Sequence, residues 1–135
     1  MVEKTVKQDR KYEILEALPK DIRKVLVDVS SKIIGCKEVC FVMLYGSYAK
    51  GTWNPESDID MAVFLRDNVK DMFYFYKKFN RITMSSGYDF QIQVFNQCET
   101  IEPEGIVEEI VMFGIRINER RDDLSGEQHE RTINQ

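Results

Sequence analysis

The sequence has little of what zinc sites, disulfide frameworks, secretion and membrane insertion require. It contains one histidine, His129, and three cysteines, and no two cysteines have CxxC spacing. This argues against a zinc site and favours small buried or half-buried thiols in a reducing compartment. No apolar run approaches the roughly 20 residues of a membrane span, and the polar N-terminus lacks the apolar core of a signal peptide. We therefore expect a cytoplasmic protein without membrane contact.

Basic residues are in slight deficit. The 19 Lys and Arg residues against 23 Asp and Glu residues give a net charge of −4, which disfavours broad nucleic-acid binding but allows a locally basic nucleotide pocket. A chain of 135 residues is long enough for one core and too short for two. We expect one domain over residues 1–117, with its core from about residue 20, and a polar tail over residues 118–135.

Hydrophobic periodicity predicts an α/β protein. Helical spacing is typical of one set of segments, strand-like runs or alternation are typical of another, and the first eleven residues are polar and expected to fray. The expected helices cover residues 20–34, about 69–82 and 106–113, and the expected strands cover 39–45, 59–65, 88–95 and 115–117. This order predicts a small mixed sheet with helices packed mainly on one face and polar side chains on the other.

The stretch over residues 41–65 carries the main functional signal. An apolar run ends at Gly46 and Ser47, a short linker follows, and Asp58 and Asp60 open the next apolar run. Because side chains alternate along a strand, the two acids face the same side, about 7 Å apart along the chain. Taken singly, each feature is an ordinary turn or cap. Together, two carboxylates beside a glycine turn favour a site for a divalent cation and a triphosphate.

The segment GSYAKGTWNPESDID at residues 46–60 resembles the signature of the DNA polymerase beta nucleotidyltransferase superfamily. More narrowly, the chain resembles the small, single-domain minimal nucleotidyltransferases (MNT) over about residues 20–117. The resemblance implies a Mg²⁺-dependent enzyme that transfers a nucleoside monophosphate, by default AMP from ATP, with two Mg²⁺ ions. Asp58 and Asp60 would be metal ligands and catalytic residues. Gly46, Ser47 and Lys50 would bind the nucleotide, with Lys50 in the place of the arginine that the family usually has.

Active relatives place a third acid on the next strand, and this is where the chain departs from the family pattern. Asp89 is the only acid of the expected strand over residues 88–95, and we assign it as the third catalytic and metal-binding residue. The family register, however, puts Gln91 at that position, and a glutamine is neither a base nor an anionic ligand. A bulge or shifted register would bring Asp89 into the site. Otherwise Asp89 is an acid beside the Gly87 turn and the protein is catalytically weak.

Three linker residues have two interpretations each. Ser57 is assigned to nucleotide binding, although it equally suits a turn cap. Trp53 and Tyr48 could stack on a base or simply cover the linker.

The resemblance also implies a partner protein, because MNT proteins lack the extra domain that usually binds the acceptor. Many members are antitoxins that bind a HEPN ribonuclease toxin and adenylylate it on tyrosine. One alternative is an interaction module that neutralises its partner by binding alone, which Lys50 and Gln91 favour. The other is a small-molecule nucleotidyltransferase of the aminoglycoside-modifying kind, working as a dimer or with a second subunit, to which an acidic surface would be suited.

Overall fold

The computed structural model describes residues 2–120, with side chains from Arg10 onward. Within this part of the chain no helix is long and apolar enough to cross a membrane. The elements, in chain order, are α1 (Val2–Ala17), α2 (Lys20–Ile34), β1 (Val39–Tyr45), α3 (Ser47–Lys50), β2 (Ile59–Leu65), α4 (Met72–Met84), β3 (Phe90–Asn96), the 3₁₀ turn η1 (Gln97–Thr100), α5 (Ile106–Phe113) and β4 (Ile115–Glu119).

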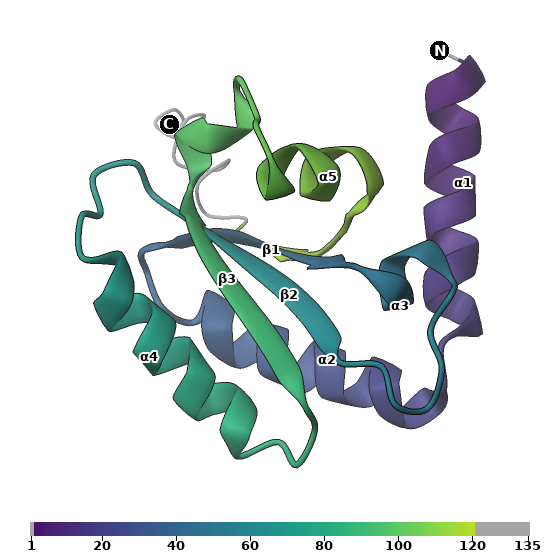
Figure 1. Cartoon of the computed structure of the whole chain (residues 1–135), viewed down its shortest axis with the longest axis horizontal. Helices are drawn as coiled ribbons and strands as arrows, with labels where there is room; N and C mark the ends of the chain where they lie inside the picture. Colours follow the sequence, from purple (N-terminus) through teal and green to yellow (C-terminus); the bar gives the residue numbers. More distant parts are fainter. Residues whose placement is uncertain (1, 121–135) are drawn as a thin grey trace, which may run out of the picture.

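The four strands form one mixed sheet in the order β3-β2-β1-β4. Strand β1 is antiparallel to both β2 and β4, whereas β2 and β3 are parallel and are connected through α4. Helices α2 and α4 lie against one face, and the short α5 lies over the other (Figure 1). The predicted α/β fold, with a mixed sheet and helices mainly on one face, is therefore confirmed.

The two sheet faces carry separate apolar clusters. The α2–α4 face holds the larger one, which includes Val42, Leu44, Met61, Val63 and Ile92. On the α5 face the aromatic rings of three adjacent strands lie against one another. Phe41 and Phe64 stack with centroids 4.7 Å apart, and Phe64 and Phe95 are tilted with centroids 5.3 Å apart. Val107 and Ile110 of α5 cover this smaller cluster. Towards the start of β2 the same face becomes polar, and the acids lie there.

Helix α1 corrects the expectation of a frayed N-terminus. The polar composition of the first eleven residues predicted fraying, and Tyr12, Leu15 and Leu18 predicted at most one short amphipathic turn or helix before Pro19. In the structure Ile14 and Leu15 pack against the core, and Leu18 is 3% exposed. Burial of these apolar side chains anchors the C-terminal end of the helix, and no glycine or proline interrupts the turns before it.

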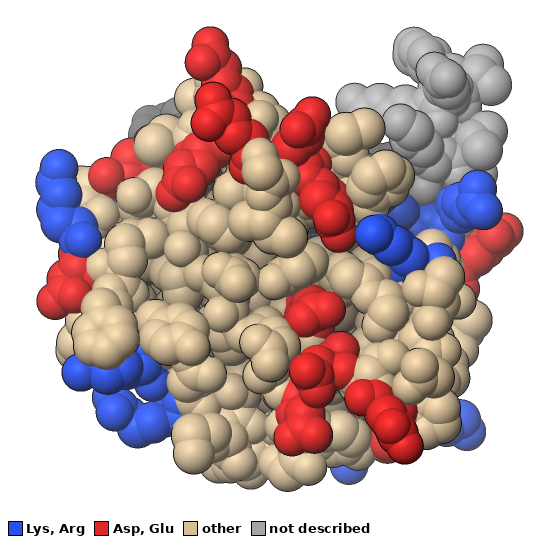
Figure 2. All heavy atoms as spheres, in the orientation of Figure 1, with Lys and Arg blue, Asp and Glu red and all other residues tan. Residues whose placement is uncertain are grey.

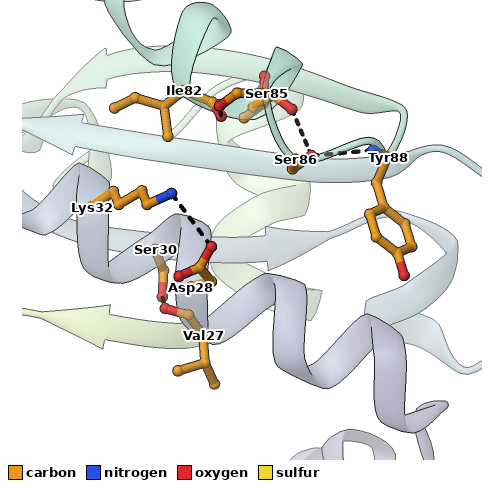
Figure 3. Close-up of polar contacts among 9 residues, drawn as sticks. Val27, Asp28, Ser30, Lys32, Ile82, Ser85, Ser86 and Tyr88 are labelled. Carbon is orange, nitrogen blue, oxygen red and sulfur yellow. Dashed lines mark hydrogen bonds and ion pairs between the residues drawn. The ribbon is translucent and has the colours of Figure 1, made fainter.

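A tight turn between α4 and β3 determines where β3 begins (Figure 3). The Ser86 hydroxyl donates to the Thr83 carbonyl at 2.5 Å and accepts from the Tyr88 amide at 3.1 Å. Gly87 between them has φ 84°, a conformation that favours glycine. The chain then enters the sheet, where the Ile59 amide donates to the Asp89 carbonyl at 2.9 Å. This connection sets the parallel register of β2 and β3.

Strand β4 ends at Glu119, two residues beyond the expected domain boundary at residue 117. Arg120 follows and joins this end of the sheet to the α2–β1 connection. Its Nε donates to the Val39 carbonyl at 2.9 Å, and its Nη2 donates to the carbonyls of Cys36, at 2.7 Å, and Ile34. The remainder of the predicted tail, residues 121–135, lies outside the described residues, and the domain assignment stays a prediction.

We expect Arg120→Ala to lower the free energy of unfolding by about 2 kcal/mol, since three partly buried carbonyl groups lose a charged donor. Arg120→Lys should recover only part of this, because an ammonium group lacks the planar fork. Urea unfolding measures both. Arg81→Ala, an exposed arginine in the last turn of α4, is the control and should change stability by less than about 0.5 kcal/mol. Equal stability of Arg120→Ala and the wild type would contradict the assigned role.

Candidate active site

The site begins where β1 ends. Gly46 follows Tyr45 with φ 73° and ψ −152°, and the single helical turn α3 starts at the next residue. The amides of Ala49 and Lys50 both donate to the Gly46 carbonyl at 3.1 Å. An L-residue is strained at this positive φ, so the turn requires glycine.

The second half of the motif lies directly against this turn. Asp60 is the cross-strand partner of Tyr45 in the antiparallel β1–β2 pair. A Cβ atom built on Gly46 would lie only 2.1 Å from Asp60 Oδ2. The glycine therefore does two things: it permits the turn, and it leaves the space that the Asp60 carboxylate occupies. Two motif elements fourteen residues apart in sequence are thus in contact.

Negative charge accumulates around Asp60. Burial raises the pKa of this half-buried carboxyl above its usual value, and the charges of Asp58 and Glu109 raise it further. The same surroundings raise the pKa of Tyr45 to about 12, mainly through burial and then through Asp60 and Glu109, while a hydrogen bond with the Gln93 side chain opposes the shift. A bound cation would offset this repulsion.

The β3 side of the site carries Gln91, at the position where the motif resemblance implies an acid. Gln91 is the parallel partner of Asp60, and its Nε2 lies 3.5 Å from Asp58 Oδ2 as a long donor contact. Asp89 comes one pleat earlier and lines a neighbouring cavity of about 430 Å³ that Trp53 and Tyr88 also line. Among residues 2–120 no group of three His, Cys, Asp or Glu side chains is close enough to hold a metal ion. Asp89 as the third acid stays a prediction.

The donor set nevertheless fits Mg²⁺. This ion is commonly held by one or two carboxylates together with water and substrate phosphates, not by an all-protein cage. Asp58 is exposed and immediately precedes β2, and Asp60 is half-buried on that strand, so the two carboxylates lie beside one another at the polar part of the sheet face. The glycine turn lies next to them.

Comparison with known proteins decides the family. The model of the family described as Polymerase beta, Nucleotidyltransferase matches residues 28–123, which include β1, the glycine turn, both acids and all of β3. The chain belongs to this nucleotidyltransferase family. The superfamily resemblance inferred from the motif is thereby confirmed, and the chain is of the nucleotidyl-transferring class.

The chain is also similar to individual proteins and solved structures. A protein of Methanocaldococcus jannaschii, whose name describes it as a "putative protein adenylyltransferase", is 26% identical over 107 residues, which are 78% of this chain and 96% of that protein. The crystal structure of a "putative nucleotidyltransferase" from Sulfolobus solfataricus has the same fold, with a TM-score of 0.50 and 20% identity over 82% of this chain and 88% of that one. A toxin–antitoxin structure with AMP-PNP aligns with a TM-score of 0.48 at 18% identity, over 82% of this chain and 89% of that chain.

Lys50, at the arginine position of the nucleotidyltransferase motif, is held by α5. Its Nζ lies 3.2 Å from Glu109 Oε2 and 5.6 Å from the ring centre of Phe113. Sequence reasoning missed Glu109, because nothing in the spacing of α5 indicates that this glutamate returns to the glycine turn. Both side chains are about two-fifths exposed, at 44% and 40%, so the ion pair is accessible to a competing anion.

The linker of the nucleotidyltransferase motif is held mainly by its own contacts. The Ser57 hydroxyl accepts from the Asn54 amide at 2.9 Å, which is the turn-capping interpretation of this serine. Tyr48 is 4% exposed, and its ring stacks on Trp53 with centroids 5.6 Å apart and an interplanar angle of 14°. These two aromatic residues therefore cover the linker in the structure. Nucleotide binding by Ser57 and by Ser47, the first residue of α3, stays a prediction.

Acidic and basic side chains lie beside one another on the face that carries the site. Figure 2 shows acidic groups running down this face over the sheet and basic groups next to them on the side where α1 stands. A triphosphate with its cation requires this kind of divided surface, since the metal binds carboxylates and the phosphates bind cations.

We expect Gly46→Ala to unfold much more readily than the wild type, because the new methyl group meets both a positive φ and the Asp60 carboxylate. The matched control is Gly87→Ala, whose φ is 84° but whose added Cβ would meet no atom within 4 Å. In each variant the strained backbone conformation should lower the free energy of unfolding by about 1 kcal/mol. In Gly46→Ala the clash should lower it by about 2 kcal/mol more. Chemical denaturation measures both. Equal losses would show that Asp60 does not press against the turn.

The raised pKa of Asp60 predicts the sign of a pH effect on stability. Between the ordinary Asp pKa of about 3.9 and the higher folded value, the folded state binds more protons, so stability falls as the pH rises through this window. Asp60→Asn removes the ionisable carboxyl and with it this loss of stability at higher pH. In chelator at neutral pH its Tm should exceed that of the wild type, and the difference should shrink as the pH falls towards about 4.

Added Mg²⁺ should reverse the order of the Tm values of the wild type and Asp60→Asn. The ion stabilises only a protein that binds it, by about 1.4 kcal/mol at ten times its Kd. We therefore expect added Mg²⁺ to raise the Tm of the wild type and not that of Asp60→Asn. Asp28→Asn, an exposed change on α2, is the control and should respond to Mg²⁺ as the wild type does. Identical Mg²⁺ responses of the wild type and Asp60→Asn would remove Asp60 from the metal site.

Proposed function

We propose that this protein transfers AMP from ATP to a hydroxyl group of a partner protein and that it acts as an MNT-type antitoxin on a HEPN-type toxin. The observation that carries the proposal is the contact between Gly46 and Asp60, because it joins a phosphate-sized turn to a carboxylate in one site. A protein acceptor is supported by the name of the M. jannaschii relative, of which this chain covers 96%.

In this proposal Asp58 and Asp60 hold the Mg²⁺ ions, two in number. When bound, the metal supplies charge neutralisation at the α-phosphate and at the leaving pyrophosphate. Gly46 lets the phosphates approach the backbone, and Ser47 offers a hydroxyl and an amide donor to them. Lys50 exchanges its contact with Glu109 for a contact with phosphate, which is possible because the exposed ion pair is weak. Asp89 supplies the third acid.

A second candidate function is favoured by β3. Gln91 pairs with Asp60 at the position of the missing acid, and an amide neither accepts a proton nor neutralises a metal ion. Lys50 replaces the bidentate guanidinium of the family with a single charge that Glu109 already contacts. These features fit an interaction module that keeps the nucleotidyltransferase fold and neutralises its partner by binding alone.

An adenylylation assay separates the two functions. The protein is incubated with Mg²⁺ and ATP labelled at the α-phosphate, with and without the product of the neighbouring gene. We expect label on the partner, none from ATP labelled at the γ-phosphate, and a loss of at least about 100-fold in Asp58→Asn and Asp60→Asn, because each removes an anionic metal ligand. Tight partner binding by all three proteins without label transfer would establish the interaction module instead.

Two changes on β3 test the third acid. If Asp89 completes the site, Asp89→Asn should lower the transfer rate by about 10- to 100-fold. Gln91→Asp should raise it, since a carboxylate then lies at the register position opposite Asp60. The control is Glu102→Gln, an exposed change beyond η1. An unchanged rate and unchanged Mg²⁺ affinity in Asp89→Asn would exclude Asp89 from the site.

A further inference from the structure

A basic pocket lies beside the nucleotidyltransferase site and belongs to no part of the motif except α3. It has a volume of about 290 Å³ and lies between α1, α3 and α5. Its lining residues are three cations and four apolar residues, with no acid among them: Arg10, Lys11, Ile14, Ala49, Lys50, Met112 and Phe113. The lining of the pocket is therefore positively charged, although the chain as a whole has a net charge of −4.

The pocket and the proposed nucleotide site share α3 as a wall. Gly46 and Asp60 lie at the start of this helical turn, and Lys50 at its end lines the pocket. Helix α1 stands beside α3, and α5 lies over β1 (Figure 1). Glu109 of α5 contacts Lys50 at the end of α3. Basic side chains accordingly lie next to acidic ones on the face shown in Figure 2. A chain of phosphates that starts at the acids reaches the pocket after one helical turn, about 5 Å.

Lys50 alone is a weak phosphate ligand in this protein. A lysine binds phosphate as a point charge without the fork of an arginine, and here Glu109 lies 3.2 Å from its Nζ. Arg10 brings a guanidinium group, and Lys11 a second ammonium group, to the same pocket from a different helix. Met112 and Phe113, each 53% exposed, form the apolar part of the wall beside these cations.

We propose that Arg10 and Lys11 bind the β- and γ-phosphates of ATP together with Lys50, so that α1 forms the phosphate-binding wall of the site. This inference rests on the proposed function, since it requires that ATP binds. It assigns a role to α1, which precedes the region matched by the family model. It also explains how a lysine suffices where the family uses arginine: charge from α1 makes up the difference.

Calorimetric titration with Mg²⁺ present tests the proposal without relying on activity. The wild type is compared with Arg10→Ala/Lys11→Ala for ATP, AMP and inorganic pyrophosphate. Alanine is the strongest helix former, so the double change does not weaken α1, and circular dichroism checks this. The matched control is Lys20→Ala/Lys24→Ala, which removes the same charge from exposed positions on α2 outside this pocket.

We expect the double variant to lose about tenfold in affinity for ATP and pyrophosphate, as one lost charge-assisted contact suffices for that, and to bind AMP as the wild type does. The control should bind all three ligands as the wild type does. Increasing ionic strength should weaken ATP binding more in the wild type than in the double variant.

Four results would overturn the inference, and they separate it from the proposed function. Unchanged ATP affinity in the double variant would show that α1 does not bind the phosphates, and it would leave the proposed adenylyl transfer unaffected. An equal loss in the control shows a general charge effect and no pocket. Absence of ATP binding by the wild type removes the proposed function together with the inference. Lost binding to the partner protein with unchanged ATP affinity would assign the pocket to the partner and likewise overturn a phosphate site.

Discussion

The carboxylate of Asp60 lies where the side chain of residue 46 would be in any other residue type, with a virtual Cβ 2.1 Å from Oδ2. This close approach brings the end of β1 and the start of β2 together and leaves an anion half-buried among other anions. Such an arrangement is unfavourable for the isolated fold, because burial and like charges both raise the free energy of the ionised carboxyl. Stability sacrificed at one position is typical of sites that bind a ligand of opposite charge.

The division of the α5 face makes that arrangement possible. The rings of Phe41, Phe64 and Phe95 fill the half that α5 covers, and the face then changes from aromatic to polar within one pleat of β2, at Ala62 and Asp60. Helix α5 is only eight residues long. The helix ends at Gly114, where a Cβ would lie 2.4 Å from the Ile110 carbonyl oxygen, and the chain returns to the sheet as β4. The short helix thus leaves the acids accessible.

Elements with strong local signals were predictable from the sequence. The bounds of α2, β1, β2 and α5 agree with the expected ranges, because Pro19, Gly35, Gly46 and Gly114 mark their ends and the apolar pattern is regular between them. The place of the two motif acids at the start of β2 was predictable for the same reason, whereas their role as metal ligands stays a prediction. The start of α4 was misplaced. Asp71 caps it, with the Tyr74 amide 3.1 Å from its carboxylate. Asp67, which precedes the expected start at about residue 69, instead accepts from the Cys98 amide at 2.7 Å.

Features that depend on tertiary contacts were not predictable. Helix α1 has a weak amphipathic pattern and is anchored through Ile14, Leu15 and Leu18, which meet the core only in three dimensions. The approach of Glu109 to Lys50 and the basic pocket beside α1 arise in the same way, from helices that lie far apart in sequence. Local periodicity carries no information on which distant side chains meet.

The hydrogen bonds of Arg120 fix the end of the described chain at one end of the sheet. They hold the end of the described chain against Val39, at the first residue of β1, whereas Gly46 follows the last residue of the same strand. Seven residues of extended chain separate the two ends by about 20 Å. The described chain therefore ends at the end of the strands opposite to the acids. A fluorophore or affinity handle attached there is tethered at a distance from the nucleotide, and the motif end stays open to whatever docks on it.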